Sequence, residues 1–441
     1  MSRHPYLVSL GALPLAERSG FVRKVAPSHV EATGPFATLG DLCEIDNGPG
    51  RARTLAEVAA VEDNHIVLVP LDQTIAILPD AKVWAAPSKT LAPVGDAFAG
   101  RLIDALGEPI DGGASILSNE LAPIVGKVLQ PLERKDPNSV LETGLRALDG
   151  LLTIGKGQRI GVFAASGVGK TTLVRQLATQ VSAKRCVLCL VGERGREVET
   201  MWRELSSQAD AKKYACVAAT SDLSPALRVR AVYQALSLAE YWRGAGEDVL
   251  LILDSTTRFA MALREIGLAA GAPPTLRAYT PNVFSALPRI VERCGSAKSG
   301  GSITAIMTVL SETDDVDDPI VEVMKSLLDG HIILSRQLAE QGHFPAIDVP
   351  RSISRQSPQL MAGAHASAAR RTISALSAYE EGRIMVESGI YKSGANPRLD
   401  AAIRSRSEMT AFLRQSPSQR SAFAETLAHL TKISAGVSDH A

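Results

Sequence analysis

The chain has 441 residues, and its 47 basic and 47 acidic side chains give a formal net charge of zero. At about 150 residues per domain, this length predicts about three domains. Apolar residues make up 45% of the chain and charged residues 21%, which excludes a disordered chain, a collagen-like repeat and a coiled coil. Zero net charge and 4% aromatic residues argue against a nucleic-acid partner, and the charge also argues against bulk attraction to anionic membrane.

The cysteine content and the N-terminus indicate the cellular compartment. Five cysteines, an odd number spread over a long chain, fit a reducing environment. No run approaches the about 20 apolar residues that a membrane-spanning helix needs. Segment 6–16 follows Arg3 and His4 and weakly resembles a signal peptide, but Pro14 interrupts it and no convincing cleavage site follows. We therefore expect a soluble, cytoplasmic protein.

In chain order, the first expected region is all-β. Short β-prone runs at 21–31, 42–45 and 66–70 alternate with turn residues such as those at 47–50. Strands this short and closely spaced predict a small sandwich or barrel over about the first 90 residues. A proline-rich stretch follows, in which we expect segment 100–112 to be irregular structure between two turns.

From Gly155 the pattern changes to apolar strands that alternate with amphipathic helices. The expected helix 225–243 begins with a proline, whose missing N–H costs nothing at a helix start. Near-continuous apolar strands joined by helices predict a parallel sheet covered on both faces. From about Pro358 to Thr431 the chain is expected to be helical. The expected strands are 160–164, 186–191, 214–219, 249–253 and 303–309.

Two patterns resemble metal sites without fitting one. Cys186 and Cys189 form a CxxC pair inside the expected strand 186–191. Residues three apart on a strand point to opposite faces, so the two sulfurs cannot converge on one metal, and we expect core residues. The acidic segment 314–318 lacks the glycine and the distal glutamate of a calcium loop, which favours a solvated run of charge.

Segment 164–171, Ala-Ala-Ser-Gly-Val-Gly-Lys-Thr, carries the strongest chemical signal. It follows an expected strand and opens an expected helix, as a phosphate-binding P-loop requires; the alternative is a strand–helix turn that binds nothing. Backbone N–H groups of such a loop surround phosphate oxygens. We expect Lys170 to reach the β- and γ-phosphates and Thr171 to bind Mg²⁺. The expected nucleotide-binding residues of the loop are Ala165, Ser166, Gly167, Val168, Gly169, Lys170, Thr171 and Thr172.

Two carboxylates complete the expected nucleotide site. Asp254 ends the apolar run 249–254, which places it at the carboxyl edge of the sheet as a second Mg²⁺ ligand. Glu193 follows the strand 186–191 at the same edge and is a candidate general base for the attacking water. The alternative for Glu193 is a solvated carboxylate in a charged loop.

Several segments, in the right order, closely resemble the type III secretion and flagellar export ATPases, relatives of the rotary ATP synthase α and β subunits. The resemblance runs from about residue 20 to about 410. One departure is Ala165, where the family usually has glycine; the first glycine position of the general P-loop pattern is also alanine, Ala164. The segments that carry the resemblance are 100–112, 141–149, 191–198, 254–267, 329–336, 344–349 and 352–355.

The resemblance implies an α/β fold. It consists of a RecA-like P-loop ATPase core, an N-terminal β-barrel and a C-terminal helical domain, with expected boundaries at 1–90, 91–357 and 358–441. The implied assembly is a homohexamer with nucleotide bound between subunits. The implied cofactors are ATP and Mg²⁺.

The resemblance also implies residue roles. Lys170 and Thr171 bind phosphate and Mg²⁺, Asp254 is the Walker B acid, and Glu193 is the catalytic carboxylate. Arg194 and Arg258 face the γ-phosphate, and Phe344 stacks on adenine. Arg355 is implied to enter the site of a neighbouring subunit, where a guanidinium stabilises the charge of the transition state. Arg351 is a rival for that role, but Arg355 alone falls in the Ser-Ile-Ser-Arg pattern.

The expected function is ATP hydrolysis that drives chaperone release and substrate unfolding or entry in a type III export apparatus. Segment 258–262 and Gly34-Pro35 favour the flagellar branch over the injectisome. A rotary synthase subunit is disfavoured by the helical C-terminus and segment 329–331, and a Rho-like RNA motor by zero charge and few aromatic residues. A non-catalytic subunit is disfavoured because Glu193 is not an amide.

The resemblance implies partners as well. They are the export-gate, stator and stalk proteins of the apparatus, together with export substrates and their chaperones. Through the apparatus, the chain would associate peripherally with the cytoplasmic face of the inner membrane.

Overall fold

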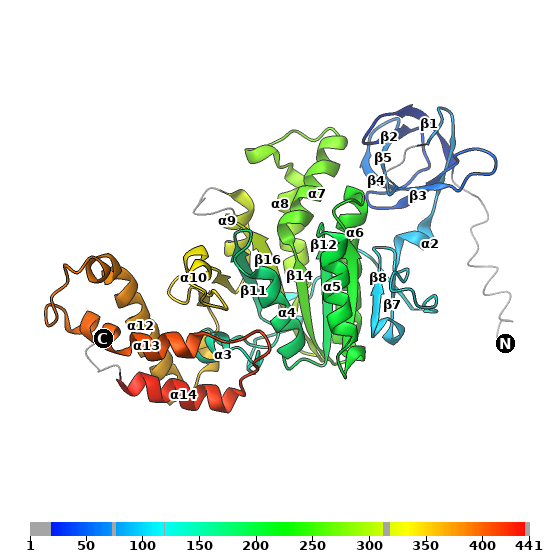
Figure 1. Cartoon of the computed structure of the whole chain (residues 1–441). Helices are drawn as coiled ribbons and strands as arrows, with labels where there is room; N and C mark the ends of the chain where they lie inside the picture. The colour runs from blue at the N-terminus through cyan, green and yellow to red at the C-terminus, as the bar shows by residue number, and fades with distance from the viewer. Residues whose placement is uncertain (1–18, 73–75, 119, 312–317, 437–441) are drawn as a thin grey trace, which may run out of the picture.

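A computed structural model describes residues 19–72, 76–118, 120–311 and 318–436. An N-terminal barrel, a central sheet with helices and a group of C-terminal helices follow one another along the molecule (Figure 1). The segment 6–16 and most of the acidic segment 314–318 lie outside the described residues. No helix within the described ranges is long and apolar enough to cross a membrane.

The first region is a closed barrel of six strands, which confirms the barrel and not the sandwich of the two predicted architectures. Their order around it is β1-β2-β5-β4-β3-β6, and neighbouring strands are antiparallel. The run 21–31, expected to be a single β-prone run, is divided between two paired strands, because the chain reverses around Pro27. The strands are β1 Ser19–Val25, β2 Val30–Ala32, β3 Leu42–Ile45, β4 Thr54–Val61, β5 Ile66–Pro70 and β6 Lys82–Ala85.

The connection from barrel to core corrects one prediction. Segment 100–112 is not entirely irregular, because its first residues form β8 (Arg101–Ile103), a parallel edge strand of the central sheet. Leu102 and Ile103 are buried there, and Arg101 binds Asp111 at 2.7 Å across the following turn. The connection also contains α2 Pro87–Thr90, β7 Ala92–Val94, η1 Asp96–Phe98, β9 Glu120–Ala122, η2 Pro131–Glu133 and β10 Arg134–Lys135.

The central sheet is parallel over its main strands, as predicted. Its order is β18-β17-β11-β16-β14-β12-β13-β8, with β15 and β10 added beside β16. Each predicted strand is present, extended by one residue at one or both ends except for 214–219. The strands are β11 Arg159–Ala164, β12 Arg185–Val191, β13 Tyr214–Ala219, β14 Asp248–Asp254, β15 Gly295–Ala297, β16 Ser302–Leu310, β17 Gly330–Ile333 and β18 Ile353–Ser354.

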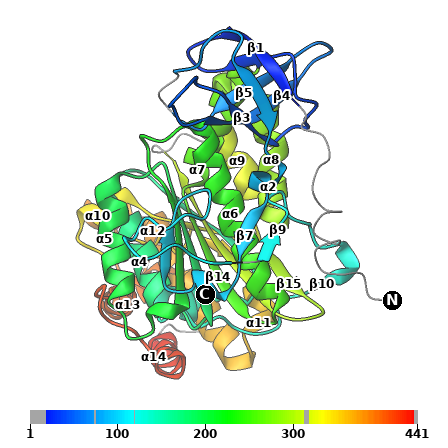
Figure 2. The ribbon, with the colours of Figure 1, turned by 90° about the vertical axis from the view of Figure 1, so that its right-hand side faces the viewer.

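Helices cover both faces of the sheet (Figure 2). One core includes side chains of α4 (Lys170–Gln180) and α5 (Gly195–Ser206), and the other includes α6 (Pro225–Gly244) and α7 (Thr256–Ala269). Cys186 belongs to the first core and Cys189 to the second, so the two thiols lie on opposite faces, as the strand period predicts. The remaining helical segments of the core are α3 Arg146–Leu151, η3 Ala211–Lys213, η4 Leu276–Ala278, α8 Pro281–Glu292, α9 Pro319–Leu327, α10 Arg336–Glu340 and α11 Ser357–Leu360.

Three helices form the C-terminal part of the described chain. They are α12 (Gly363–Glu387), α13 (Pro397–Leu413) and α14 (Phe423–Gly436), which pack on one another and on α3. Phe412 and Leu430 are fully buried between them. This packing joins the C-terminal helices to the core just before its first main strand, β11, in the sequence.

Candidate functional site

The loop between β11 and α4 has the backbone that the P-loop prediction requires. Gly167 and Gly169 have φ values of 81° and 96°, in the left-handed region that favours glycine. Gly169 is the N-cap of α4, so Lys170 is the first residue of the helix. Neither Ala164 nor Ala165 has a positive φ, so alanine fits both positions without backbone strain. The departure from the usual glycines therefore leaves the loop intact.

Three predicted charged residues converge at the carboxyl edge of the sheet. β11, β12 and β14 are parallel, so the segments that follow them emerge at the same edge. The Lys170 ammonium donates to a carboxylate oxygen of Asp254 and lies 3.2 Å from Oε1 of Glu193. The side chains are 11% exposed for Lys170, 18% for Glu193 and 3% for Asp254. The structure therefore brings together residues that are 84 positions apart in the sequence.

The shared burial of these groups shifts their pKa values. Burial lowers the pKa of Lys170, but the charges of Asp254 and Glu193 outweigh this effect and raise it overall. The pKa of Glu193 is raised, first by burial and then by a hydrogen bond with Glu197, and Lys170 opposes both effects. Lys170 thus stays protonated at neutral pH, while the Glu193 carboxylate is more basic than an exposed glutamate. A carboxylate tuned upward is suited to accept a proton from water.

The two predicted arginines near this edge are placed differently. The side chain of Arg258 lies over Gly192: a Cβ atom placed on that glycine would be 2.9 Å from the Arg258 Cβ. Within the described chain, the buried Nε of Arg258 has no hydrogen-bond partner, which leaves a donor available for an anion. Arg194 is exposed at the N-cap of α5, next to Glu193, and no described contact fixes its guanidinium in the site.

Phe344 lies beside the P-loop. A Cβ atom placed on Gly169 would be 3.5 Å from a carbon of the Phe344 ring, so the ring and the loop are close neighbours. The side of the ring away from the glycine is open, since Phe344 is 41% exposed. An exposed aromatic ring next to a phosphate loop has the position that a purine base requires for stacking.

Arg355 is at the opposite end of the sheet from the P-loop. It follows β18, whose Ser354 pairs with Gly330, and Gly330 pairs with Ile160 at the start of β11. The P-loop begins after Ala164, the last residue of β11, which at 3.3 Å per residue is about 13 Å further along the sheet. The exposed Arg355 donates to the Lys325 carbonyl at 3.3 Å. In its own chain, Arg355 is thus separated from Lys170.

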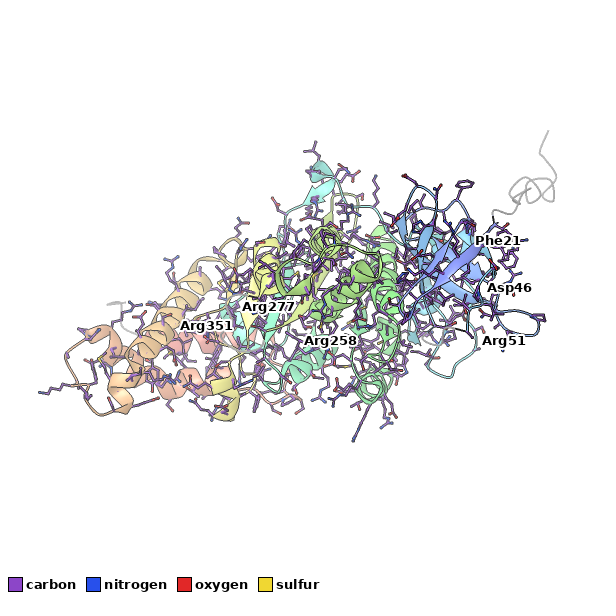
Figure 3. The ribbon with its side chains drawn as sticks, turned by 90° about the horizontal axis from the view of Figure 1, so that it is seen from above. Phe21, Asp46, Arg51, Arg258, Arg277 and Arg351 are labelled. Carbon is purple, nitrogen blue, oxygen red and sulfur yellow. The ribbon has the colours of Figure 1, made fainter. Side chains whose placement is uncertain are left out.

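Arg351, the rival arginine, occupies a different position. It lines a cleft of 460 Å³ that also borders Ala165 of the P-loop and Arg336. In Figure 3, Arg351 lies nearer than Arg258 to the C-terminal helices. Arg351 therefore lies on the P-loop side of its own chain, whereas Arg355 is exposed at the opposite end of the sheet.

The residues predicted to hold Mg²⁺ offer oxygen donors of the right chemistry. Asp254 supplies a buried carboxylate, and Thr171 is exposed in the first turn of α4, next to Lys170. Hard oxygen donors of this kind suit Mg²⁺, which usually binds through one or two carboxylates together with substrate phosphates. The donor set fits the ion.

The structure adds site residues that sequence reasoning did not identify. The Thr308 hydroxyl, fully buried in β16, donates to a carboxylate oxygen of Asp254 at 2.6 Å. Glu197, in the first turn of α5, raises the pKa of Glu193. Thr308 is one of three hydroxyl residues in a mostly apolar strand, and Glu197 is one charge in a charged segment. Neither pattern distinguishes a site residue from an ordinary one, because the contact depends on strand order.

Comparison with known proteins identifies the family. Residues 144–354 match the ATP synthase alpha/beta family, nucleotide-binding domain, and residues 361–432 match the T3SS EscN ATPase C-terminal domain. The flagellum-specific ATP synthase of Pseudomonas aeruginosa is 40% identical over 97% of this chain and 95% of its own. The type 3 secretion system ATPase of Xanthomonas euvesicatoria is 40% identical over 96% of each chain.

A solved structure supports the same assignment. It is the assembled ATPase EscN in complex with its central stalk EscO from the enteropathogenic E. coli type III secretion system. It is 37% identical, has a TM-score of 0.84, and covers 94% of this chain and 100% of that chain. Barrel, nucleotide-binding core and C-terminal helices are thus shared over nearly the whole length. The chain belongs to the ATP synthase alpha/beta family and, within it, to the ATPases of flagellar and type III secretion systems.

Proposed function

We propose that this chain is the ATP-hydrolysing subunit of a type III protein export apparatus of the flagellar kind. The observation that carries the proposal is the convergence of Lys170, Glu193 and Asp254 beside a glycine-dependent phosphate loop. A catalytic carboxylate at position 193 supports a hydrolase rather than a non-catalytic nucleotide-binding subunit.

In the proposed mechanism, the chain's own residues bind the nucleotide, accept a proton from water and stabilise negative charge on the phosphates. The backbone of 165–169 and Lys170 hold the phosphates, and Phe344 stacks on the adenine. Glu193 accepts a proton from the attacking water, which its raised pKa favours. Arg258 and Arg194 stabilise negative charge on the γ-phosphoryl group. Mg²⁺, held by Thr171 and Asp254, would neutralise phosphate charge when bound with ATP.

We infer that the active form is a homohexamer in which Arg355 acts on the nucleotide of the neighbouring subunit. The separation of Arg355 from Lys170 within one chain supports this inference. So does the likeness to EscN, which is described as an assembled ATPase. The stalk complex of EscN supports an equivalent stalk partner here. The three domains are proposed to be 1–90, 91–357 and 358–441.

The wider role is proposed from the family. The hexamer would act at the cytoplasmic face of the inner membrane, with export-gate and stator proteins, and would release chaperones from export substrates. An injectisome ATPase is the second candidate, because a type 3 secretion ATPase is as similar to this chain as a flagellar one.

The test is deletion of the chain from its host followed by measurement of secreted proteins. We expect flagellin to disappear from the medium, with recovery by the wild-type chain and none by the Lys170→Ala chain. Loss of needle-type proteins with flagellin unaffected would establish the injectisome instead. Normal secretion of both kinds would overturn the proposed export function.

A further inference from the structure

The segment 414–419, between α13 and α14, contacts Phe344, the start of the core and the P-loop helix α4. Its second residue, Gln415, is 3% exposed. The backbone N–H of Gln415 donates to the Phe344 carbonyl at 2.9 Å. This bond joins the segment directly to the residue beside the P-loop glycine.

The side chain of Gln415 fixes the segment to the start of the core. Its amide Nε2 donates to the Gly144 carbonyl and to the Gln419 carbonyl, each at 2.7 Å. Its Oε1 accepts from the backbone N–H of Arg146 at 2.9 Å. Both amide hydrogens and the amide oxygen are therefore bonded. A fully satisfied buried polar network of this kind defines one geometry, because each unmade bond would leave a buried group unpaired.

The same segment is bonded to the P-loop helix. Gln176 and Gln180, one turn apart on α4, donate to the carbonyls of Ser416 and Pro417 at 3.3 and 3.0 Å. The helix that begins with Lys170 and the loop that carries Phe344 are thus held through one short segment. The bonds to α4 are made by the carbonyls of Ser416 and Pro417, whereas Gln415 itself bonds the Phe344 carbonyl.

We propose that Gln415 is a positioning residue that holds Phe344 beside the P-loop, so that the C-terminal helices set the affinity for the nucleotide base. The proposal rests on the proposed role of Phe344 in adenine stacking. Gln415 bonds the Phe344 backbone and not the phosphate loop itself, which is why its effect is on the base. The phosphates are bound by 165–170, whose backbone geometry is set by Gly167 and Gly169.

The experiment measures binding of two probes, ATP and inorganic tripolyphosphate, to the full-length chain with Mg²⁺. Gln415→Met keeps the side-chain volume but removes all three side-chain hydrogen bonds. We expect it to weaken ATP binding about fivefold, the factor that corresponds to one net hydrogen bond. Tripolyphosphate binding should be unchanged, and the KM for ATP should rise with kcat unchanged.

Three variants provide the comparison. Gln419→Ala removes an exposed glutamine side chain from the same segment and should bind both probes as the wild type does. Phe344→Ala should weaken ATP binding about 5- to 150-fold, the range for loss of aromatic stacking on a base. Combining Gln415→Met with Phe344→Ala should add nothing, because Gln415 acts through Phe344.

The outcomes separate the two proposals. If Phe344→Ala weakens ATP binding and Gln415→Met does not, the positioning role is wrong and the adenine role stands. Equal weakening of ATP and tripolyphosphate binding by Gln415→Met would also overturn the positioning role, since it would indicate general damage to the core. If Phe344→Ala leaves ATP binding unchanged, the adenine role of Phe344 fails, and the inference fails with it. Gln415→Ala serves as the second variant if Gln415→Met does not fold.

Discussion

The two ends of the central sheet hold their functional charges in different ways. At the carboxyl end, Lys170, Glu193 and Asp254 are at most 18% exposed, and Lys170 pairs with both carboxylates within one chain. At the amino end, Arg355 is exposed, and its guanidinium donates to a backbone carbonyl rather than to a carboxylate. Under the proposed mechanism, one end would bind a nucleotide with its own residues, whereas the other would supply a cation to a second chain. Binding would then be a property of the subunit, and full catalysis a property of the assembly.

The largest effect is expected from removing the exposed arginine, Arg355. Arg355→Ala should lower kcat about 10³- to 10⁵-fold, because an arginine acting in trans stabilises the transition state by that factor. Nucleotide binding to the isolated chain should change little. Mixing Arg355→Ala with Lys170→Ala protein should restore some turnover, since a mixed interface can combine an intact P-loop with an intact arginine.

Arg351→Ala is the matched control for this experiment. Arg351 lines the cleft beside its own P-loop, so it would act in the same site as Lys170. Mixing Arg351→Ala with Lys170→Ala protein should therefore restore no turnover. Absence of rescue at every mixing ratio of Arg355→Ala with Lys170→Ala would contradict the action of Arg355 in trans.

The next largest effect is expected from the carboxylate at the buried end. Glu193→Gln should reduce kcat about 10²- to 10⁴-fold, because an amide cannot accept the proton of the attacking water. ATP binding should persist, since Lys170 and Asp254 remain. Steady-state turnover and equilibrium binding of the assembled protein measure the two effects. Turnover close to that of the wild type would remove Glu193 from the mechanism.

The raised pKa of Glu193 predicts the pH dependence of catalysis. Burial, followed by the Glu197 hydrogen bond, raises this pKa above the ordinary value of 4.5. Proton acceptance needs the ionised form, so kcat/KM should fall as the pH falls through the raised pKa. The acid limb should therefore lie at higher pH than for an exposed glutamate.

Glu197→Gln sharpens this test. It removes a neighbouring carboxylate that raises the pKa of Glu193, so the acid limb should move to lower pH. A pH profile of kcat/KM measures the acid limb in the wild type and in Glu197→Gln. An acid limb that stays in place in Glu197→Gln would contradict the assignment of the limb to Glu193.

The smallest effect is expected at Thr308, which supports Asp254 from β16. Thr308→Val keeps the shape of the side chain but removes one buried hydrogen bond. It should lower kcat/KM about fivefold. Thr304→Val is the control, because Thr304 lies on the same strand but accepts from Gly157 at 2.8 Å, away from Asp254. Both variants should lose about 1 kcal/mol of stability, but Thr304→Val should keep its kcat/KM.

Much of the core could be predicted because local patterns agree with the fold. The P-loop follows from small residues between an apolar strand and a helix, and the separation of Cys186 from Cys189 follows from the strand period. The short strands β15, β17 and β18 were not among the expected strands, and segment 100–112 was expected to be irregular. Its strand is three residues long and is stabilised by pairing with β13, more than a hundred positions away, so no local periodicity reveals it.

By itself, the sequence determined which residues can carry the chemistry: the glycines of the phosphate loop, the lysine that follows them, and two carboxylates that each follow an apolar strand. These are local properties, set by backbone conformation and by the order of strand and loop. Only the tertiary structure decided which groups meet. Lys170 contacts Asp254, Thr308 supports it, and Gln415 holds Phe344, while Arg355 lies at the far end of the sheet. Those contacts depend on strand order and on the docking of the C-terminal helices, which bury polar groups from distant parts of the chain and require each one to find its partner.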